Sequence, residues 1–128
     1  MSKLLAYAEL IADVTTAFTA VDVSRPVTRG VIISASIHMI TSGGGNTVGR
    51  GFAGFSSLDN PNGAPGGMIL QGPVSVLSGL RWDGRIQLLP NMQIVLNCNA
   101  PDTAVFAATF LIETEFDDNP GRGAANNA

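Results

Sequence analysis

Few residues in this sequence belong to types that carry out chemistry. The chain has one histidine, His38, and one cysteine, Cys98, which do not supply the nitrogen and sulfur ligands of a zinc site. A serine–histidine–acid triad would have to use His38, and the sequence has no nucleophile-elbow motif. Cys98 lies on the apolar side of a predicted strand, where a thiol is expected to be an inert core side chain. These two residues predict neither a catalytic centre nor a metal centre.

Two carboxylate pairs and one glycine-rich stretch are the remaining candidates. Glu113 and Glu115 share one side of a predicted strand and are interpreted as solvated side chains. Asp117 and Asp118 offer the hard oxygen ligands that calcium takes, but a solvated strand end is the commoner arrangement. Residues 45–51 lack the Lys-Ser/Thr pair and the following helix of a phosphate-binding loop. We therefore predict that the protein is not an enzyme and binds no cofactor and no metal.

The charge content is unusually low for a chain of one domain. Charged residues make up 13% of the 128 residues, and lysine occurs once, whereas soluble domains carry about 25%. One interpretation is a surface of uncharged polar side chains. The other is that much of the surface is buried in an assembly, because the cores of protein interfaces are depleted of charge. We favour the second interpretation.

Several partner classes are disfavoured by the same composition. The net charge is −3 and no basic cluster is present, which argues against nucleic-acid binding. No apolar run approaches the length that spans a bilayer. Glu9 and Asp13 interrupt what would be the apolar region of a signal peptide, so we interpret the N-terminus as mature sequence.

The strands expected to position any functional side chain are clearest near the end of the chain. Residues 92–99 alternate strictly, with one apolar set on one face: Met92, Ile94, Leu96 and Cys98. Residues 104–116 place three phenylalanines on one side, namely Phe106, Phe110 and Phe116. Alternation of period two is typical of half-buried antiparallel strands. We predict that a turn at Pro101-Asp102 joins the two strands into a hairpin that forms the spine of the core.

Further strands are predicted upstream. In residues 31–40 we expect an inward set, Val31, Ile33, Ala35, Ile37 and Met39, and an outward set, Ile32, Ser34, Ser36, His38 and Ile40. Asp83-Gly84 predicts a second hairpin turn, and Asn91 is expected to adopt a left-handed conformation. Residues 3–13 fit a helix or a strand with no clean polar face, and we choose the strand.

About eight strands with turn signals between them predict an all-β domain, an antiparallel β-sandwich of single jelly-roll type. We place this domain at residues 1–116. Residues 117–128 are rich in Asn, Gly and Ala and are predicted to form a flexible tail or an arm.

The sequence resembles the small jelly-roll virion proteins of tailed bacteriophages, which include capsid decoration (cement) proteins and related tumour-necrosis-factor-like fibre-head domains. The resemblance lies in Leu5-Ala6-Tyr7-Ala8-Glu9, in Thr15, Thr16 and Thr19, and in the stretch from Leu89-Pro90-Asn91 to Phe110-Leu111-Ile112. In such proteins a Leu-Pro-Gly turn often opens the penultimate strand, and here Asn91 stands in place of the glycine.

This resemblance implies a structural virion protein that binds the outer capsid surface as an oligomer, commonly a trimer, and stabilises the capsid. Its partners would be copies of itself and the major capsid protein. Candidate interface residues are Ile32 and Ile40, on an otherwise polar strand face, and Arg81, Trp82 and Arg85, since Trp and Arg are typical interface anchors. The alternative is a fibre-head or receptor-binding module that recognises a host-surface glycan or protein, with Trp82 as its aromatic platform.

Overall fold

The computed structural model describes residues 2–15, 20–26, 30–42, 47–57, 67–89 and 91–116. These residues form eight strands: β1 (Ser2–Val14), β2 (Val21–Pro26), β3 (Gly30–Ser42), β4 (Val48–Ser57), β5 (Gly67–Ser75), β6 (Leu80–Leu88), β7 (Met92–Asn99) and β8 (Ala104–Phe116). The strand chosen for residues 3–13 is therefore confirmed. The predicted tail at 117–128 lies outside the described residues. No helix in the described part of the chain is long and apolar enough to cross a membrane.

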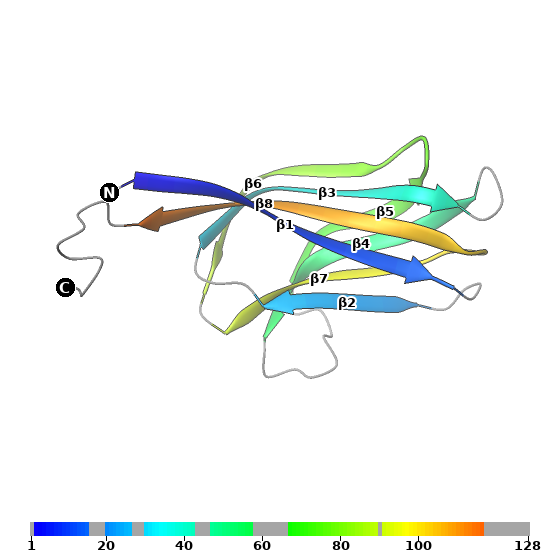
Figure 1. Cartoon of the computed structure of the whole chain (residues 1–128), viewed down its shortest axis with the longest axis horizontal. Coiled ribbons are helices and arrows are strands. Elements are labelled where there is room, and N and C mark those ends of the chain that lie inside the picture. Colours follow the sequence, from blue (N-terminus) through cyan, green and yellow to red (C-terminus); the bar gives the residue numbers. More distant parts are fainter. Residues whose placement is uncertain are drawn as a thin grey trace.

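The strands form two four-stranded sheets, of order β1-β8-β3-β6 and β2-β7-β4-β5 (Figure 1). β1 pairs with β8, β2 with β7, β3 with β6 and β4 with β5, all antiparallel. These are the pairings of one long hairpin whose halves are β1 to β4 and β5 to β8. Folding that hairpin over brings β3 against β8 and β4 against β7. The predicted β-sandwich with jelly-roll topology is confirmed.

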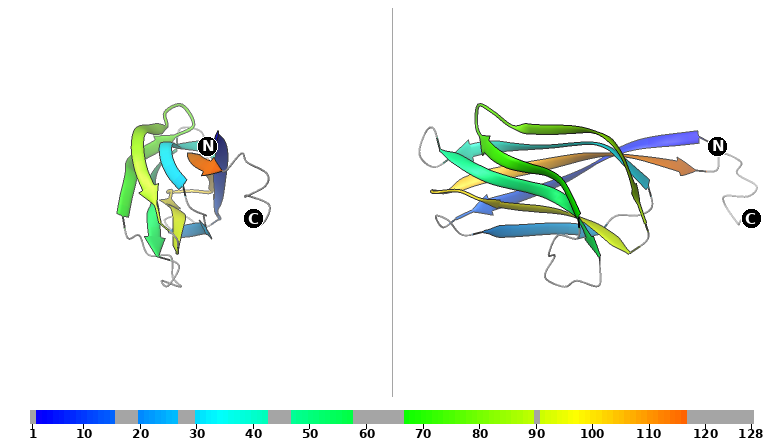
Figure 2. Two further views of the ribbon diagram at one scale, coloured as in Figure 1. Left: turned by 90° about the vertical axis from the view of Figure 1, so that its left-hand side faces the viewer. Right: turned by 180° about the vertical axis from the view of Figure 1, so that it is seen from behind.

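The hairpin predicted at Pro101-Asp102 is wrong, although both strands exist. β7 and β8 belong to different sheets, and the connection between them crosses from one layer to the other. Two strands of a hairpin would place their apolar faces side by side on one sheet. Figure 2 shows the two layers of strands. In opposite sheets the same faces point at each other, and both become buried between the layers. Packing of the two layers therefore overrides the local turn signal.

The core fills the space between the sheets. Phe106 and Phe110 from β8 are fully buried, as are Ile94, Leu96 and Cys98 from β7. β1 contributes a buried row on alternate residues, Ala8, Leu10, Ala12 and Val14. The predicted inward faces of β7 and of β8 as far as Ile112 are confirmed, whereas the side chain predicted inward at Phe116 lies outside the described residues.

A β-bulge in β3 overturns the placement of Ile32. Ile32 pairs with Ile112 while Ser34 pairs with Leu111, so β3 has one residue more than β8 at this point. A bulge reverses the alternation of faces beyond it. As a result Ile32 is fully buried, and Ile33 lines the outer surface instead. The predictions that Ile32 faces outward and Ile33 inward were both wrong.

The hairpin predicted at Asp83-Gly84 is also wrong, because β6 continues through these residues, with a register shift against β3 between Asp83 and Ile86. The glycine has a packing role instead: a Cβ on Gly84 would lie 2.4 Å from Cζ2 of Trp82. Gly84 thus leaves room for the indole ring. The left-handed conformation predicted for Asn91 is confirmed by its φ of 73°.

Candidate functional site

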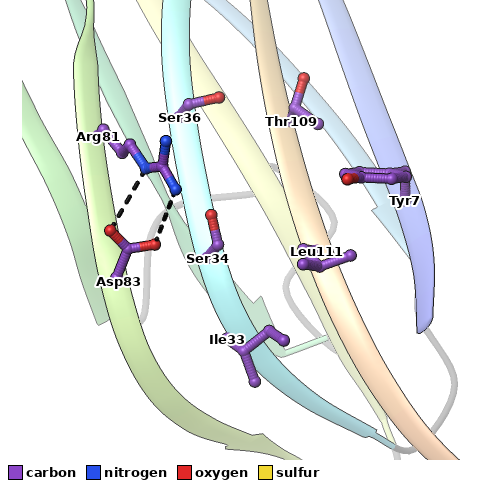
Figure 3. Close-up of a pocket in the computed structure, with 8 residues that line it drawn as sticks. All are labelled: Tyr7, Ile33, Ser34, Ser36, Arg81, Asp83, Thr109 and Leu111. Carbon is purple, nitrogen blue, oxygen red and sulfur yellow. Dashed lines mark hydrogen bonds and ion pairs between the residues drawn. The ribbon is translucent and has the colours of Figure 1, made fainter. Parts of the chain in front are cut away.

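A surface hollow lies on the outer face of the sheet β1-β8-β3-β6 (Figure 3). Its volume is about 330 Å³. The register aligns Tyr7, Leu111, Ser34 and Asp83 in one row across the four strands, and Glu9, Thr109, Ser36 and Arg81 in the next. The small side chains on β3 and β8 form the floor, and larger side chains on β1 and β6 form the walls.

One wall is an ion pair on β6. Nε of Arg81 lies 3.3 Å from Oδ2 of Asp83, and Nη2 of Arg81 donates to Oδ1 at 3.4 Å. Residues two apart on a strand share a face, so the pair holds the guanidinium along the outer surface. Nearby, Nη2 of Arg85 donates to Oε1 of Glu113 at 3.3 Å. Exposed pairs of this kind add little stability, but they order the side chains.

The opposite wall is β1, whose outward side chains are unusually apolar. Leu5 is 56% exposed, Tyr7 75% and Ile11 53%. These residues alternate with the buried row of the same strand, so they cannot be moved into the core without moving that row out. The sequence signal for them was the absence of a clean polar face in residues 3–13.

β1 is also the longest edge strand of the sandwich. The edge strands are β1, β6, β2 and β5, and an edge exposes backbone N–H and C=O groups that can pair with another chain. Proline interrupts β2 at Pro26 and β5 at Pro73. β1 and β6 contain no proline, and both carry charged residues: Lys3, Glu9 and Asp13 in β1, and Arg81, Asp83 and Arg85 in β6. β1 has 13 residues, no proline and no register shift against β8.

The five predicted interface residues do not form one surface. Ile40 is 46% exposed near the end of β3, and Arg81 and Arg85 are exposed on the outer face of β6. Trp82 is partly buried and packs against the core. Ile32 is buried. The structure therefore keeps the two arginines and Ile40 at the surface and places Ile32 and Trp82 on the inner face.

Residues with catalytic or metal-binding chemistry are dispersed. His38 is exposed on β3. No three His, Cys, Asp or Glu side chains among the described residues lie close enough together to hold a metal ion. Asp102 accepts a hydrogen bond from Oγ1 of Thr47 at 2.7 Å.

Cys98 is held in its protonated form by its surroundings. Burial raises the pKa of its thiol from 9.0 to about 12, and the negative charge of Asp22 adds to the increase. The thiolate is the reactive form, so we expect a thiol reagent at pH 8 to modify Cys98 only when the protein unfolds.

The same pKa predicts alkaline destabilisation. Between pH 9 and about 12 the unfolded thiol ionises while the folded thiol stays protonated, so the unfolded state binds fewer protons. The free energy of unfolding therefore falls by up to about 1.4 kcal/mol per pH unit in this interval. Urea unfolding of the wild type and of Cys98→Ala from pH 8 to 11 tests this, and the difference between the two proteins should shrink as pH rises. A difference that stays constant over this range would contradict the buried-thiol assignment.

No protein-family model matches the sequence, and no curated protein matches it either. Solved structures that are similar to it include the following three. A Yersinia pseudotuberculosis-derived mitogen is 12% identical, with 91% of this chain and 93% of that chain covered and a TM-score of 0.49. A structure described as Bacillus endospore appendages, a family of disulfide-linked pili, is 17% identical, with 90% and 93% covered and a TM-score of 0.46.

The third structure is dimeric latent PorU from Porphyromonas gingivalis, at 13% identity and a TM-score of 0.35. It covers 88% of this chain but only 13% of that chain. Similarity at these levels concerns the β fold and assigns neither a family nor a function.

Proposed function

We propose that this chain is a structural protein of a bacteriophage virion, a decoration or cement protein that binds the outer capsid surface as a homo-oligomer. In this role it acts without catalysis and contacts neither nucleic acid nor membrane. The proposal is supported by the resemblance of the sequence and by its low charge content. The observation that carries it is the long β1 edge with exposed apolar side chains, which an isolated domain would leave open to solvent.

The charges on the two edges of the same sheet favour a particular contact between copies. β1 presents Glu9 and Asp13, and β6 presents Arg81, Asp83 and Arg85, two positive charges and one negative. Glu9 and Arg81 share a row but are three strand spacings apart, roughly 14 Å, so they cannot pair within one subunit. Both arginines have donors left beyond their existing ion pairs, because a guanidinium carries five N–H groups.

Pairing β1 with β1 of a second copy in a register centred between Glu9 and Asp13 would bring acidic side chains together, which is unfavourable. Placing β1 beside β6 of the next copy brings opposite charges together and covers Tyr7 and Ile11. Because the two contacting edges differ, this contact repeats head to tail, and it forms a ring where the rotation from copy to copy closes and an open filament where it does not. We propose the closed ring. Three copies give the trimer that the resemblance implies.

Light scattering tests the assembly. The wild type is expected at three times the chain mass of 13.2 kDa. Glu9→Arg should reduce the mass to that of the monomer, since Arg would face Arg81 and Arg85. Adding Arg81→Glu to this variant exchanges the two charges and should restore the trimer.

Arg25→Glu on β2 is the matched control, a charge reversal on an exposed edge residue of the other sheet, and should leave the mass unchanged. A monomeric wild type, or a Glu9→Arg variant that remains trimeric, would contradict this contact. Antibody labelling of intact virus particles that contain the chain tests its location. Labelling of the tail or fibre instead of the capsid surface would refute the decoration role.

A further inference from the structure

The outer face of the second sheet, β2-β7-β4-β5, differs in chemistry from the face described above. Phe52 on β4 lies directly between Asn97 on β7 and Gln71 on β5. Arg50 and Asn99 form the adjacent pair on β4 and β7. These side chains surround a hollow of about 190 Å³. An aromatic ring thus stands among two kinds of planar polar group, amides and a guanidinium.

The position of the ring follows from a neighbouring glycine. A Cβ on Gly54 would lie 3.0 Å from Cε1 of Phe52, so the absence of a side chain there lets the ring approach the sheet surface. Phe52 is only half-buried, and part of the ring faces the hollow. A phenylalanine in the core would not leave apolar area in contact with water.

The polar side chains around the ring have unused hydrogen-bonding capacity. Nδ2 of Asn97 donates to Oδ1 of Asp22, which leaves the amide oxygen of Asn97 as an acceptor. Arg50, Gln71 and Asn99 make no side-chain hydrogen bond or ion pair within the described part of the chain. Together they offer several donors and acceptors on one side of a fixed ring.

We propose that this hollow binds a neutral saccharide unit. A sugar hydroxyl is both donor and acceptor, and an amide side chain supplies one group of each kind. The C–H face of a hexose ring is apolar and flat enough to lie on Phe52. A phosphate-bearing ligand is disfavoured because Arg50 is the only cation at the hollow and Asp22 lies beside Asn97. The volume suits one sugar ring, being smaller than the roughly 300–1,000 Å³ of pockets for larger ligands.

The site is independent of the proposed assembly, which uses the edges of the other sheet. It also places the aromatic platform on Phe52, whereas the sequence suggested Trp82. A binding module of this kind would face outward on a decorated particle and is equally available in a monomer. Its test therefore succeeds or fails separately from the test of assembly.

Nuclear magnetic resonance titration of the isotope-labelled full chain tests the proposal. The probes are methyl glycosides of glucose, galactose, mannose and N-acetylglucosamine, each added to roughly 50 mM, which detects binding in the millimolar range. At least one glycoside is expected to shift backbone amide signals that cluster around Phe52 on β4, β5 and β7. Phe52→Ala should weaken that binding at least about tenfold.

Arg50→Ala is a second variant that changes an exposed side chain without touching the packing, and it should weaken binding in the same titration. Tyr7→Ala, an exposed aromatic on the other sheet, is the control and should bind as the wild type does. The proposal is overturned if none of the four glycosides shifts signals at this face. It is equally overturned if Arg50→Ala and Phe52→Ala bind normally, or if inorganic phosphate shifts the same signals at lower concentration.

Discussion

Phe110→Ala is expected to lower the free energy of unfolding by about 3–5 kcal/mol, one of the largest effects expected from a single truncation in this fold. Phe110 is fully buried on β8, a central strand of its sheet. Its direct neighbours are Ala8 on β1 and Ala35 on β3, both also buried. Alanine side chains are too short to fill the space that the Phe110 ring vacates. The cavity therefore remains, and the variant loses the full free energy of unfolding that such a cavity costs.

Urea unfolding followed by circular dichroism measures this loss. Leu111→Ala is the matched control, because Leu111 is the next residue of the same strand, faces the outer surface and is half-buried. We expect it to cost about 1 kcal/mol or less. A loss below about 1 kcal/mol for Phe110→Ala would show that the ring does not fill the core.

Gly49→Ala is the second large prediction and tests the close approach of the two sheets. A Cβ at Gly49 would lie 2.6 Å from the backbone oxygen of Asn99 and 2.6 Å from Cζ of Phe106. The first is a backbone atom of β7, and the second belongs to a fully buried ring. Neither can move without disturbing the core, so we expect a loss of about 1–3 kcal/mol from overpacking.

Gly72→Ala provides the comparison. There a Cβ would meet only the methyl groups of Leu80, at 3.3 and 3.5 Å, and the added methyl restricts the unfolded chain. We expect this variant to be neutral or slightly more stable than the wild type. Equal thermal midpoints for Gly49→Ala and Gly72→Ala would mean that β4 and β8 are farther apart than described.

The two proposed binding surfaces differ in the chemistry of their side chains. The edges β1 and β6 carry the apolar and charged groups that suit contact between copies. The outer face of β2-β7-β4-β5 carries amides, one arginine and one ring, which suit a small polar ligand. Each proposal rests on its own residues, and the variants that test one leave the other intact.

Much of the local structure was determined by the sequence itself. Alternation in residues 92–99 and 104–116 predicted both strands and their buried faces, because each side chain's face follows from its own position along a strand. The left-handed Asn91 was likewise predictable from its own turn chemistry. These features depend on residues that are close to one another in the sequence.

The tertiary structure decided which strands pair and where the alternation breaks. β7 and β8 are consecutive and apolar on one face, yet only the packing of two layers places them in opposite sheets. The bulge at Ile33 buries Ile32 because β3 must match both β6 and β8 at once, a constraint that no local window of sequence contains. For the same reason the row from Tyr7 to Asp83 and the hollow at Phe52 could not be predicted: their residues come from strands distant in sequence, and register between such strands is set by the shared core.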